Sequence, residues 1–304
     1  MTTERGASAS VLAAAALWGT TGTAAAFAPD VSPPTVGAVA MGVGGLLQAA
    51  VNAPALRRHG REIRANLGVV VLGALCVFAY PLAFYTSMRI GGVALGTTVS
   101  LASAPLASAV IERFTDRRRL GARWLTACAL GIAGSALLSL SHGGDGDGSV
   151  LLGVALGLVA GGTYAGYSWA LRRLMRRGVP RSAFAGVVLG AGGVALLPVI
   201  AAHGGRLAEA APLSWWMLAY LAVVPMFLGY VLFSRGLGGI DATTATTLTL
   251  IEPAVATVLA VTILHEHLPA AGWVGMALLV AALAVLTRPG GDRLRPQTTP
   301  MSTS

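Results

Sequence analysis

Ten long apolar runs alternate along the chain with short segments that carry most of the polar and charged residues. Each run has roughly the 20 residues that a helix needs to cross the hydrocarbon core of a bilayer. The pattern therefore predicts an all-α integral membrane protein with ten transmembrane helices. The runs are Ser10–Phe27, Thr35–Leu56, Leu67–Met88, Val93–Ile111, Gly121–Leu140, Val150–Leu171, Ala183–Ala202, Ser214–Ser234, Ala242–Leu264 and Ala270–Thr287.

The first run has two interpretations. Arg5, the alanine-rich stretch after it and the Ala24–Ala28 end are typical of a signal peptide. However, the segment Trp18–Thr21 interrupts the run in mid-span, which suits helix packing better than a signal core. We therefore expect this helix to be retained, and the topology of the other helices is the same in either case.

Composition agrees with the membrane class. The chain is 55% hydrophobic and 11% charged, whereas about 25% of residues are charged in soluble proteins. The net charge is +9, and it is carried by Arg without any Lys. Because these Arg residues form short clusters between apolar runs, they indicate topology and contact with anionic lipid headgroups rather than nucleic-acid binding.

The Arg residues also predict the orientation. All but Arg89 and Arg206 fall on one side of the predicted membrane, which is a strong positive-inside signal. We therefore expect a multi-pass protein of the plasma membrane with both termini in the cytoplasm, and a disordered cytoplasmic tail over residues 288–304. The predicted inner residues are Arg5, Arg57, Arg58, Arg61, Arg64, Arg113, Arg117, Arg118, Arg119, Arg123, Arg172, Arg173, Arg176, Arg177, Arg181, Arg235, Arg288, Arg293 and Arg295.

The connections are too short to hold an extramembrane catalytic domain. Asp145 and Asp147 lie in the Gly-rich connection Ser141–Ser149, but the further oxygen ligands and the terminal Glu of a calcium loop are missing. We therefore expect a flexible outer loop there. Cys76 and Cys128 lie inside apolar runs, so packing is a better interpretation than a disulfide.

Glu252 is the single charge of the run Ala242–Leu264, near its middle, and Pro253 follows it. A carboxylate at the centre of a spanning helix costs about 3 kcal/mol on insertion scales, so an ionisable residue there is a functional candidate. We expect Pro253 to kink the helix beside a cavity. Glu252 is thus predicted to bind a proton or a substrate; a structural hydrogen bond to Thr249 or to freed backbone is the alternative.

Other side chains in the spans are weaker candidates. Aromatic residues can line the same cavity, although packing is their commoner role: Trp18, Tyr80, Tyr164, Tyr167 and Tyr230. Threonines on the inner half of the ninth run fit a water-filled path, although Thr can also bond to its own helix: Thr243, Thr244, Thr246, Thr247 and Thr249.

Two overlapping GxxxG patterns in the sixth run consist of Gly153, Gly157 and Gly161. Such patterns allow another helix to approach closely, and a gating hinge is the alternative. Gln48 and Asn52 are expected to bridge helices near the cytoplasmic end of the second run.

His265, Glu266 and His267 are a possible metal-binding group. The two His residues, at i and i+2, do not share a helix face, so we expect no metal site. Capping or orientation of the last helix by Glu266 is the favoured interpretation.

The two halves of the chain match at an offset of 148 residues, which places Pro105 on Pro253 and Thr98 on Thr246. Each half has five runs, and because five is odd, the second half must enter the membrane from the opposite side. This is the inverted repeat of many secondary transporters. The predicted domains are 1–140 and 150–287; Pro105 and Pro253 are hinge candidates, and Thr98 joins the candidate site.

The order of motifs resembles the EamA family of the drug/metabolite transporter superfamily, over about residues 10–287. The resemblance implies two five-helix repeats around a central cavity, and export or exchange of small metabolites. Helix 4 has Ala104-Pro105 where helix 9 has Glu252-Pro253, so the acidic site is one-sided. The motifs are Leu17-Trp18-Gly19, Phe84-Tyr85-Thr86-Ser87 with Gly91, Phe233-Ser234-Arg235-Gly236-Leu237, Leu250-Ile251-Glu252-Pro253, and Glu266 with Gly272 and Gly275.

These observations predict a secondary transporter, a proton-coupled exporter of small metabolites, amino acids or drug-like compounds. The sequence has no GxxxxGK[ST] loop for ATP, and we expect no cofactor. A lipid-acting membrane enzyme and a non-transporting scaffold are the alternatives. The inner loops offer a poor set of acids and bases for the enzyme, and a scaffold does not need a carboxylate in mid-membrane. The chain can be a monomer or a homodimer.

Overall fold

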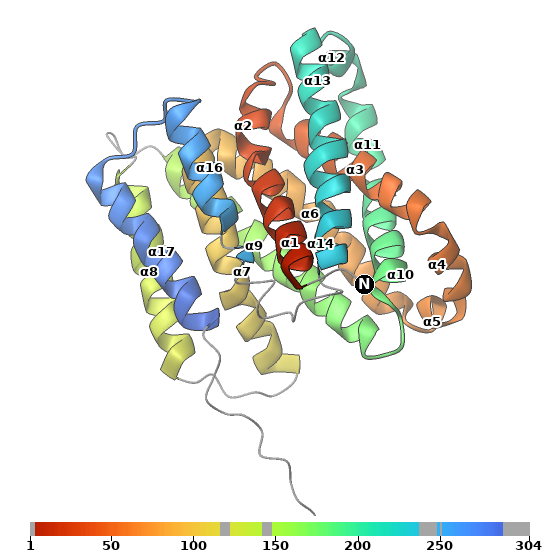
Figure 1. Cartoon of the computed structure of the whole chain (residues 1–304). Coiled ribbons are helices and arrows are strands. Elements are labelled where there is room, and N and C mark those ends of the chain that lie inside the picture. The colour runs from red at the N-terminus through yellow and green to blue at the C-terminus, as the bar shows by residue number, and fades with distance from the viewer. Residues whose placement is uncertain (1–3, 116–121, 142–147, 237–247, 250, 288–304) are drawn as a thin grey trace, which may run out of the picture.

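The structure is a computed structural model that describes residues 4–115, 122–141, 148–236, 248–249 and 251–287. Every regular element in these ranges is a helix, and each of the ten apolar runs is helical over most of its described part (Figure 1). Seven of the described helical stretches are long and apolar enough to cross a membrane. The all-α, multi-pass class is therefore confirmed, and the number of ten spans stays a prediction.

In the first half, the predicted interruption after Trp18 is present. Thr20 separates two helices, and its hydroxyl donates a hydrogen bond to the Leu17 carbonyl at 2.7 Å. The elements are α1 (Glu4–Gly19), α2 (Thr21–Ala26), α3 (Pro33–Val51), α4 (Ala53–Arg58), α5 (Gly60–Ala65), α6 (Leu67–Gly91), α7 (Val93–Thr115) and α8 (Ala122–Ser141).

The second half contains two π-helical segments, each continuous with α-helix on both sides. Such wide turns are rare and are frequent at functional sites. The elements are α9 (Gly148–Met175), α10 (Arg181–Phe184), η1 (Ala185–Leu189), α11 (Gly190–Ala202), α12 (Gly204–Ala208), α13 (Pro212–Leu221), η2 (Ala222–Gly229), α14 (Tyr230–Gly236), α16 (Ile251–Thr262) and α17 (Ala270–Thr287).

The described part of the ninth run contains residues 248–249 and α16. Glu252 lies in the first turn of α16, and its N–H donates to the Thr249 carbonyl at 3.0 Å. The first N–H groups of a helix have no carbonyl partner within it, so Pro253 fits at this position without breaking a bond. Residue 248 is helical and residue 249 is in a turn, while residue 250 lies outside the described residues, so the kink beside Glu252 stays a prediction. Thr243, Thr244, Thr246 and Thr247 lie outside the described residues.

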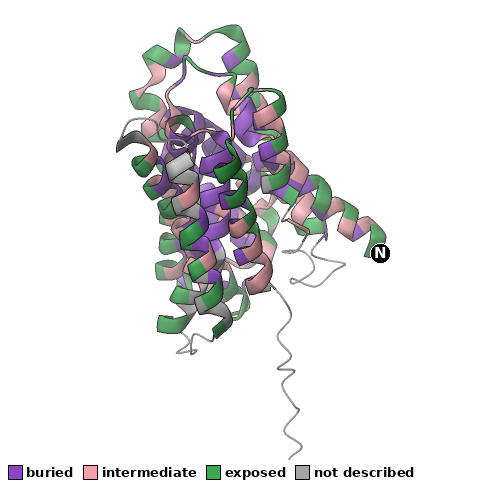
Figure 2. Ribbon diagram, turned by 90° about the vertical axis from the view of Figure 1, so that its left-hand side faces the viewer, coloured by how far each residue is buried: buried purple, intermediate pink, exposed green. Residues whose placement is uncertain are grey.

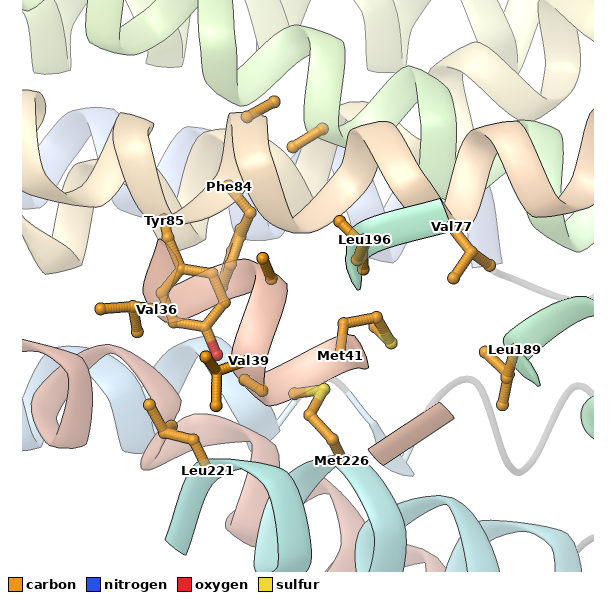
Figure 3. Packing of buried hydrophobic residues seen from close by; sticks show 14 of the residues in the cluster. Val36, Val39, Met41, Val77, Phe84, Tyr85, Leu189, Leu196, Leu221 and Met226 are labelled. Carbon is orange, nitrogen blue, oxygen red and sulfur yellow. The ribbon is translucent and has the colours of Figure 1, made fainter. Parts of the chain in front are cut away.

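Buried residues fill the interior between the helices, and exposed residues cover the outside (Figure 2). Figure 3 shows part of the core, where Val36 and Met41 of α3 lie between Phe84 of α6 and Met226 of η2. The outer surface is itself apolar, because large side chains point away from the core: Phe114, Trp216 and Leu151 are 80%, 73% and 70% exposed. A surface of this kind is suited to lipid rather than to water.

The helices pack in pairs that join the two halves of the chain. α8 lies beside α17 (Figure 1), and the other close pairs are α3 with α11, α6 with α9, α7 with α9, α1 with α14 and α1 with α16. Glycines allow several of these approaches. Gly45 of α3, for example, faces the Leu189 carbonyl so closely that a side chain there would clash.

The polar bridge predicted on α3 is present for one of its two residues. Gln48 Nε2 donates to the Phe227 carbonyl in η2 at 2.9 Å. Asn52, which lies between α3 and α4, instead bonds back to α3, where its Nδ2 donates to Gln48 O at 2.8 Å and to Gln48 Oε1 at 3.3 Å. Gln48 therefore joins two helices, and Asn52 orients Gln48.

The described Arg residues separate towards the two ends of the bundle. The N-terminus, α4, α5 and α10 lie at one end, and α2 and α12 at the other (Figure 1). Arg89, in the last turn of α6, donates to the carbonyls of Ala28, Pro29 and Val31 at 3.1–3.2 Å. It therefore holds the α2–α3 connection. We call this end, which also carries Arg206 in α12, the outer end.

Candidate functional site

A small cavity at the centre of the bundle brings together five residues that the sequence singled out. It has a volume of about 30 Å³, and we call it the chamber. Four elements contribute the aromatic part of its lining and α16 contributes the carboxylate. The five residues are Trp18 of α1, Tyr80 of α6, Tyr164 of α9, Tyr230 of α14 and Glu252 of α16.

Aromatic rings form most of the chamber wall. The ring of Trp18 lies 5.3 Å from that of Tyr230, with the planes tilted by 58°. On the other side, the Tyr80 ring is 6.0 Å from the Tyr164 ring and stacks on Phe84 at 5.3 Å. Rings at these spacings support one another, so the wall is preorganised around Glu252.

Trp18 is fixed by a bond to the π-helical segment. Its Nε1 donates to the Pro225 carbonyl of η2 at 2.9 Å. Tight packing accompanies this bond, since a Cβ at Gly229 would lie 2.7 Å from the same nitrogen. The wide turn of η2 therefore presents a backbone carbonyl to a side chain of α1, and this contact sets the orientation of the indole in the chamber.

Glu252 is held from the side of α1. The residue is only 9% exposed. A Cβ at Gly19 would lie 2.9 Å from the Glu252 carbonyl oxygen and 2.7 Å from Val255 Cβ. Because Gly19 has no side chain, α1 and the first turn of α16 can touch, and Trp18 and Glu252 thereby reach the same cavity.

Two predicted site residues do not line the chamber. Thr98 is buried in α7 and donates to the Ala94 carbonyl of its own helix at 2.6 Å. Thr249 is half-buried and supplies the carbonyl that accepts the Glu252 N–H. Pro105 lies inside α7 and Pro253 lies in the first turn of α16, and their roles as hinges stay predictions.

The three glycines of the GxxxG patterns lie against α6 and α7. A Cβ at Gly153 would be 3.1 Å from Gly91 Cα, and one at Gly157 would be 2.9 Å from Val99 Cγ1. At Gly161 it would overlap the Ser103 hydroxyl. One hydrogen bond crosses the same contact, from Ser87 Oγ to the Gly153 carbonyl at 2.6 Å.

Four lining residues were missed by the sequence analysis: Thr21, Phe84, Leu101 and Met226. A signal existed for two of them. Phe84 is four residues after Tyr80 and therefore shares its helix face. Thr21 is three residues after Trp18, next to the interruption of the first run. Nothing in the sequence pattern distinguishes Leu101 and Met226 from other core residues.

A larger cavity lies at the outer end, and we call it the vestibule. Its volume is about 380 Å³, and α2, α3, α6, the start of α7 and the connection after α16 line it. Arg89 and Glu266 are its charged residues. Because Gly22 lines the vestibule and Thr21 lines the chamber, the beginning of α2 lies between the two cavities.

Glu266 caps a helix of the other half of the chain. Its two carboxylate oxygens accept the N–H groups of Val93 and Ala94, the first residues of α7, at 2.7 and 3.1 Å. The prediction that Glu266 caps the last helix is therefore wrong. In the described part of the chain, no three His, Cys, Asp or Glu residues lie close enough to bind a metal.

Comparison with family models identifies one family, and one similar protein is named as a transporter. The model of the EamA-like transporter family matches residues 6–140 and 151–288. An uncharacterized transporter, YwfM of Bacillus subtilis (strain 168), is 32% identical over 286 residues, which cover 91% of this chain and 92% of that protein. A solved chain whose title is only "Crystal structure of protein" is similar as well. The match covers 92% of this chain and 95% of that chain, with a TM-score of 0.60 and 21% identity, and it shows a shared fold alone. The chain therefore belongs to the EamA-like transporter family, and the comparisons point to a membrane transporter rather than to an enzyme.

Proposed function

We propose that this protein is a proton-coupled exporter of small metabolites, amino acids or drug-like compounds that carry an amine or another cationic group. The observation that carries the proposal is the chamber, in which the Glu252 carboxylate lies among five aromatic side chains in the middle of the bundle. Glu252 binds a proton in one half of the cycle and the cationic group of the cargo in the other.

The chemistry of the lining favours a cation. Aromatic rings attract cations to their faces, and Trp18, Tyr80, Tyr164 and Tyr230 supply such rings. A carboxylate away from water is costly unless it is paired or neutralised. The described lining residues include no second charged group, so a proton or a cationic cargo has to neutralise Glu252, and the two compete.

The cavity volumes describe one step of the cycle. A volume of about 30 Å³ has room for about one or two water molecules, which is too little for a metabolite. The vestibule, at about 380 Å³, lies within the usual range of small-molecule sites, roughly 300–1,000 Å³. Cargo therefore reaches Glu252 only when helices around the chamber move apart, and the vestibule is its outer exit.

The proposed topology assigns the vestibule to the outer side of the membrane. The Arg-rich end faces the cytoplasm in this proposal, with both termini there, in a plasma membrane crossed by ten helices. Residues 1–140 and 150–287 form two repeats of opposite orientation, and the helix pairs that join the halves support this arrangement. Protons enter through the vestibule, neutralise Glu252 and return the empty carrier to its inward-facing state.

A panel of amines, amino acids and neutral metabolites identifies the cargo. Compounds that bind the folded state raise the apparent melting temperature of the purified protein, and those that do so are tested for pH-gradient-driven flux in proteoliposomes. Glu252→Gln should keep the fold and lose proton-driven accumulation, while exchange of cargo can remain; Glu252→Ala should lose both. The matched control is Glu209→Gln, which changes an exposed carboxylate at the outer end.

Two results would overturn the proposal. Wild-type proton drive in Glu252→Gln would remove the coupling role and leave Glu252 a structural residue. Chemical turnover of a lipid without flux would favour the membrane enzyme, and neither turnover nor flux for any compound that binds would favour the scaffold.

A further inference from the structure

Three buried hydroxyl groups in the described part of the chain have no hydrogen-bond partner: Thr21 Oγ1, Thr23 Oγ1 and Tyr85 Oη. Leaving such a group unpaired costs about 1–3 kcal/mol, and buried polar groups are normally paired with protein or water. Three orphan hydroxyls in one region therefore indicate places where water binds.

Two of the three hydroxyls belong to residues that line the cavities, and the third is nearby in α2. Thr21 lines the chamber together with Glu252, and Tyr85 lines the vestibule. Thr21 and Thr23 are both in α2, whose Gly22 lines the vestibule. Figure 3 shows the Tyr85 ring extending from α6 towards Val39 of α3. Thr21 thus borders the chamber that holds Glu252, and Tyr85 borders the vestibule from which a proton would come.

Neighbouring threonines show that this lack of a partner is not a general property of the helices. The Thr20 hydroxyl donates to the Leu17 carbonyl and lies 2.8 Å from the Tyr220 hydroxyl. Thr98 donates to a carbonyl in its own helix. Thr21 is only 3% exposed and does neither, so both its donor and its acceptor are left for a molecule in the chamber.

We propose that Thr21 holds a water molecule in the chamber and that this water passes protons from the vestibule to the Glu252 carboxylate. The inference rests on the proposed proton coupling. The water gives one proton to a carboxylate oxygen of Glu252 and receives one from the vestibule side, so that one proton moves inward and the water is regenerated. Thr21 is a positioning residue, because it holds the water and does not itself bind the cargo.

The surroundings of Glu252 leave few other groups for this role. The titratable groups that share the chamber lining are the phenols of Tyr80 in α6, Tyr164 in α9 and Tyr230 in α14. The indole N–H of Trp18 in α1 is already bonded to the Pro225 carbonyl. Among the described lining residues, Thr21 is the aliphatic hydroxyl, and the chamber volume suits one or two waters.

The test measures proton access to Glu252 without any cargo. In proteoliposomes transferred from H₂O to D₂O, infrared difference spectroscopy follows the carboxyl band that Glu252→Gln removes, and the rate at which it shifts gives the rate of proton exchange. Thr21→Val keeps the shape and removes the hydroxyl, so it should slow exchange roughly tenfold, as expected for the loss of one positioned hydrogen-bond partner. Thr21→Ser should restore the wild-type rate.

Thr257→Val is the matched control. Thr257 is also 3% exposed, but its hydroxyl contacts Met276 Sδ of α17 at 3.1 Å, away from the chamber lining. This variant should exchange at the wild-type rate. If Thr21→Val does not fold, Thr21→Cys replaces it, because a thiol is of similar size and a weak donor.

Wild-type exchange in Thr21→Val, or in Thr21→Cys where that variant replaces it, would overturn the inference, as would equal slowing in Thr257→Val. The two proposals fail separately. If Glu252→Gln keeps proton-driven flux, the proposed function fails whatever Thr21 does. If Glu252→Gln loses the drive while Thr21→Val exchanges normally, only the role of Thr21 is lost.

Discussion

Trp18 has two contacts that can be separated by one substitution. Its ring lines the chamber, and its N–H bonds to the Pro225 carbonyl. Trp18→Phe keeps an aromatic ring and leaves that carbonyl without its donor, which should lower the free energy of unfolding by about 1–3 kcal/mol. Chemical unfolding in detergent measures the change.

Trp216→Phe is the control for Trp18→Phe, because Trp216 is 73% exposed on the outer surface. It should leave the stability nearly unchanged. A Trp18→Phe protein as stable as the wild type would show that the bond to η2 does not hold α1 in place.

Asp30 makes the α2–α3 connection at the outer end sensitive to acid. The Ser214 hydroxyl and then the Ala211 N–H donate to its carboxylate and hold the pKa of Asp30 below its ordinary value of 3.8. A lowered pKa means that the contact stabilises the fold above the ordinary value and is lost as pH falls below it. Hydrogen exchange of the Ala211 amide should therefore lose protection below about pH 3.8.

Asp30→Asn removes the titrating group, so protection of the Ala211 amide in that variant should not change over the same pH window. If protection of the Ala211 amide is equally independent of pH in the wild type, the Asp30 carboxylate does not control the contact between the α2–α3 connection and α13.

Residue type and helical spacing were enough to find much of the chamber. Glu252 is conspicuous because a charge is rare in such a run, and the aromatic residues are conspicuous by type. Thr98 was selected from its repeat position, yet its hydroxyl is satisfied within α7. Thr21 was passed over, although its importance lies in having no partner. Whether a threonine hydroxyl bonds to a carbonyl of its own helix depends on tertiary packing, and the spacing of residues along the sequence does not reveal it.

At the scale of elements, α9 depends on glycine for its place between α6 and α7. Gly157→Leu puts a side chain where a single carbon would lie 2.9 Å from Val99 Cγ1 and 3.3 Å from Ser87 Oγ. Overpacking of this kind should cost about 1–3 kcal/mol, visible as lower abundance and a lower melting temperature.

Gly162 provides the matched control in the same helix, since nothing lies within 4 Å of a Cβ placed there. Gly162→Leu should express and melt like the wild type. Equal behaviour of the two variants would show that the contact of Gly157 does not limit packing.

The extents of most helices follow from the apolar runs, because a span must be apolar over its whole length. The internal features did not follow. The π-helical η1 and η2 have no signature in hydrophobic periodicity, and Pro225 lies inside η2 without breaking the span. Glu266 was assigned to the nearest helix in sequence, whereas its partner, the start of α7, lies in the other half of the chain. Such a contact depends on how the halves dock.

At the scale of the molecule, close helix pairs have counterparts when each run is replaced by the equivalent run of the other half, five places away along the chain. The third and sixth runs pair as α6 with α9, and the eighth and first runs pair as α14 with α1. The pairs α7 with α9 and α16 with α1 are related in the same way. An inverted repeat would produce this pattern, and it is the strongest structural support for the proposed two-repeat organisation.

The topology is testable by cysteine labelling in cells. On a background with Cys76→Ser and Cys128→Ser, Ser302→Cys should react with a membrane-permeant maleimide and not with an impermeant one, because the Arg distribution predicts a cytoplasmic C-terminus. Arg206→Cys, at the outer end, should react with both. Labelling of Ser302→Cys by the impermeant reagent would invert the proposed orientation.

The Glu266 bonds have a consequence for biosynthesis. The ribosome completes α7 long before it reaches Glu266, so the first half of the nascent chain enters the membrane with two N–H groups at the start of α7 that still lack their final acceptor. That helix end reaches its native state only after the connection between α16 and α17 has been translated. The first half is therefore an unfinished intermediate during synthesis, in which water or lipid headgroups have to accept these two N–H groups until the Glu266 carboxylate arrives.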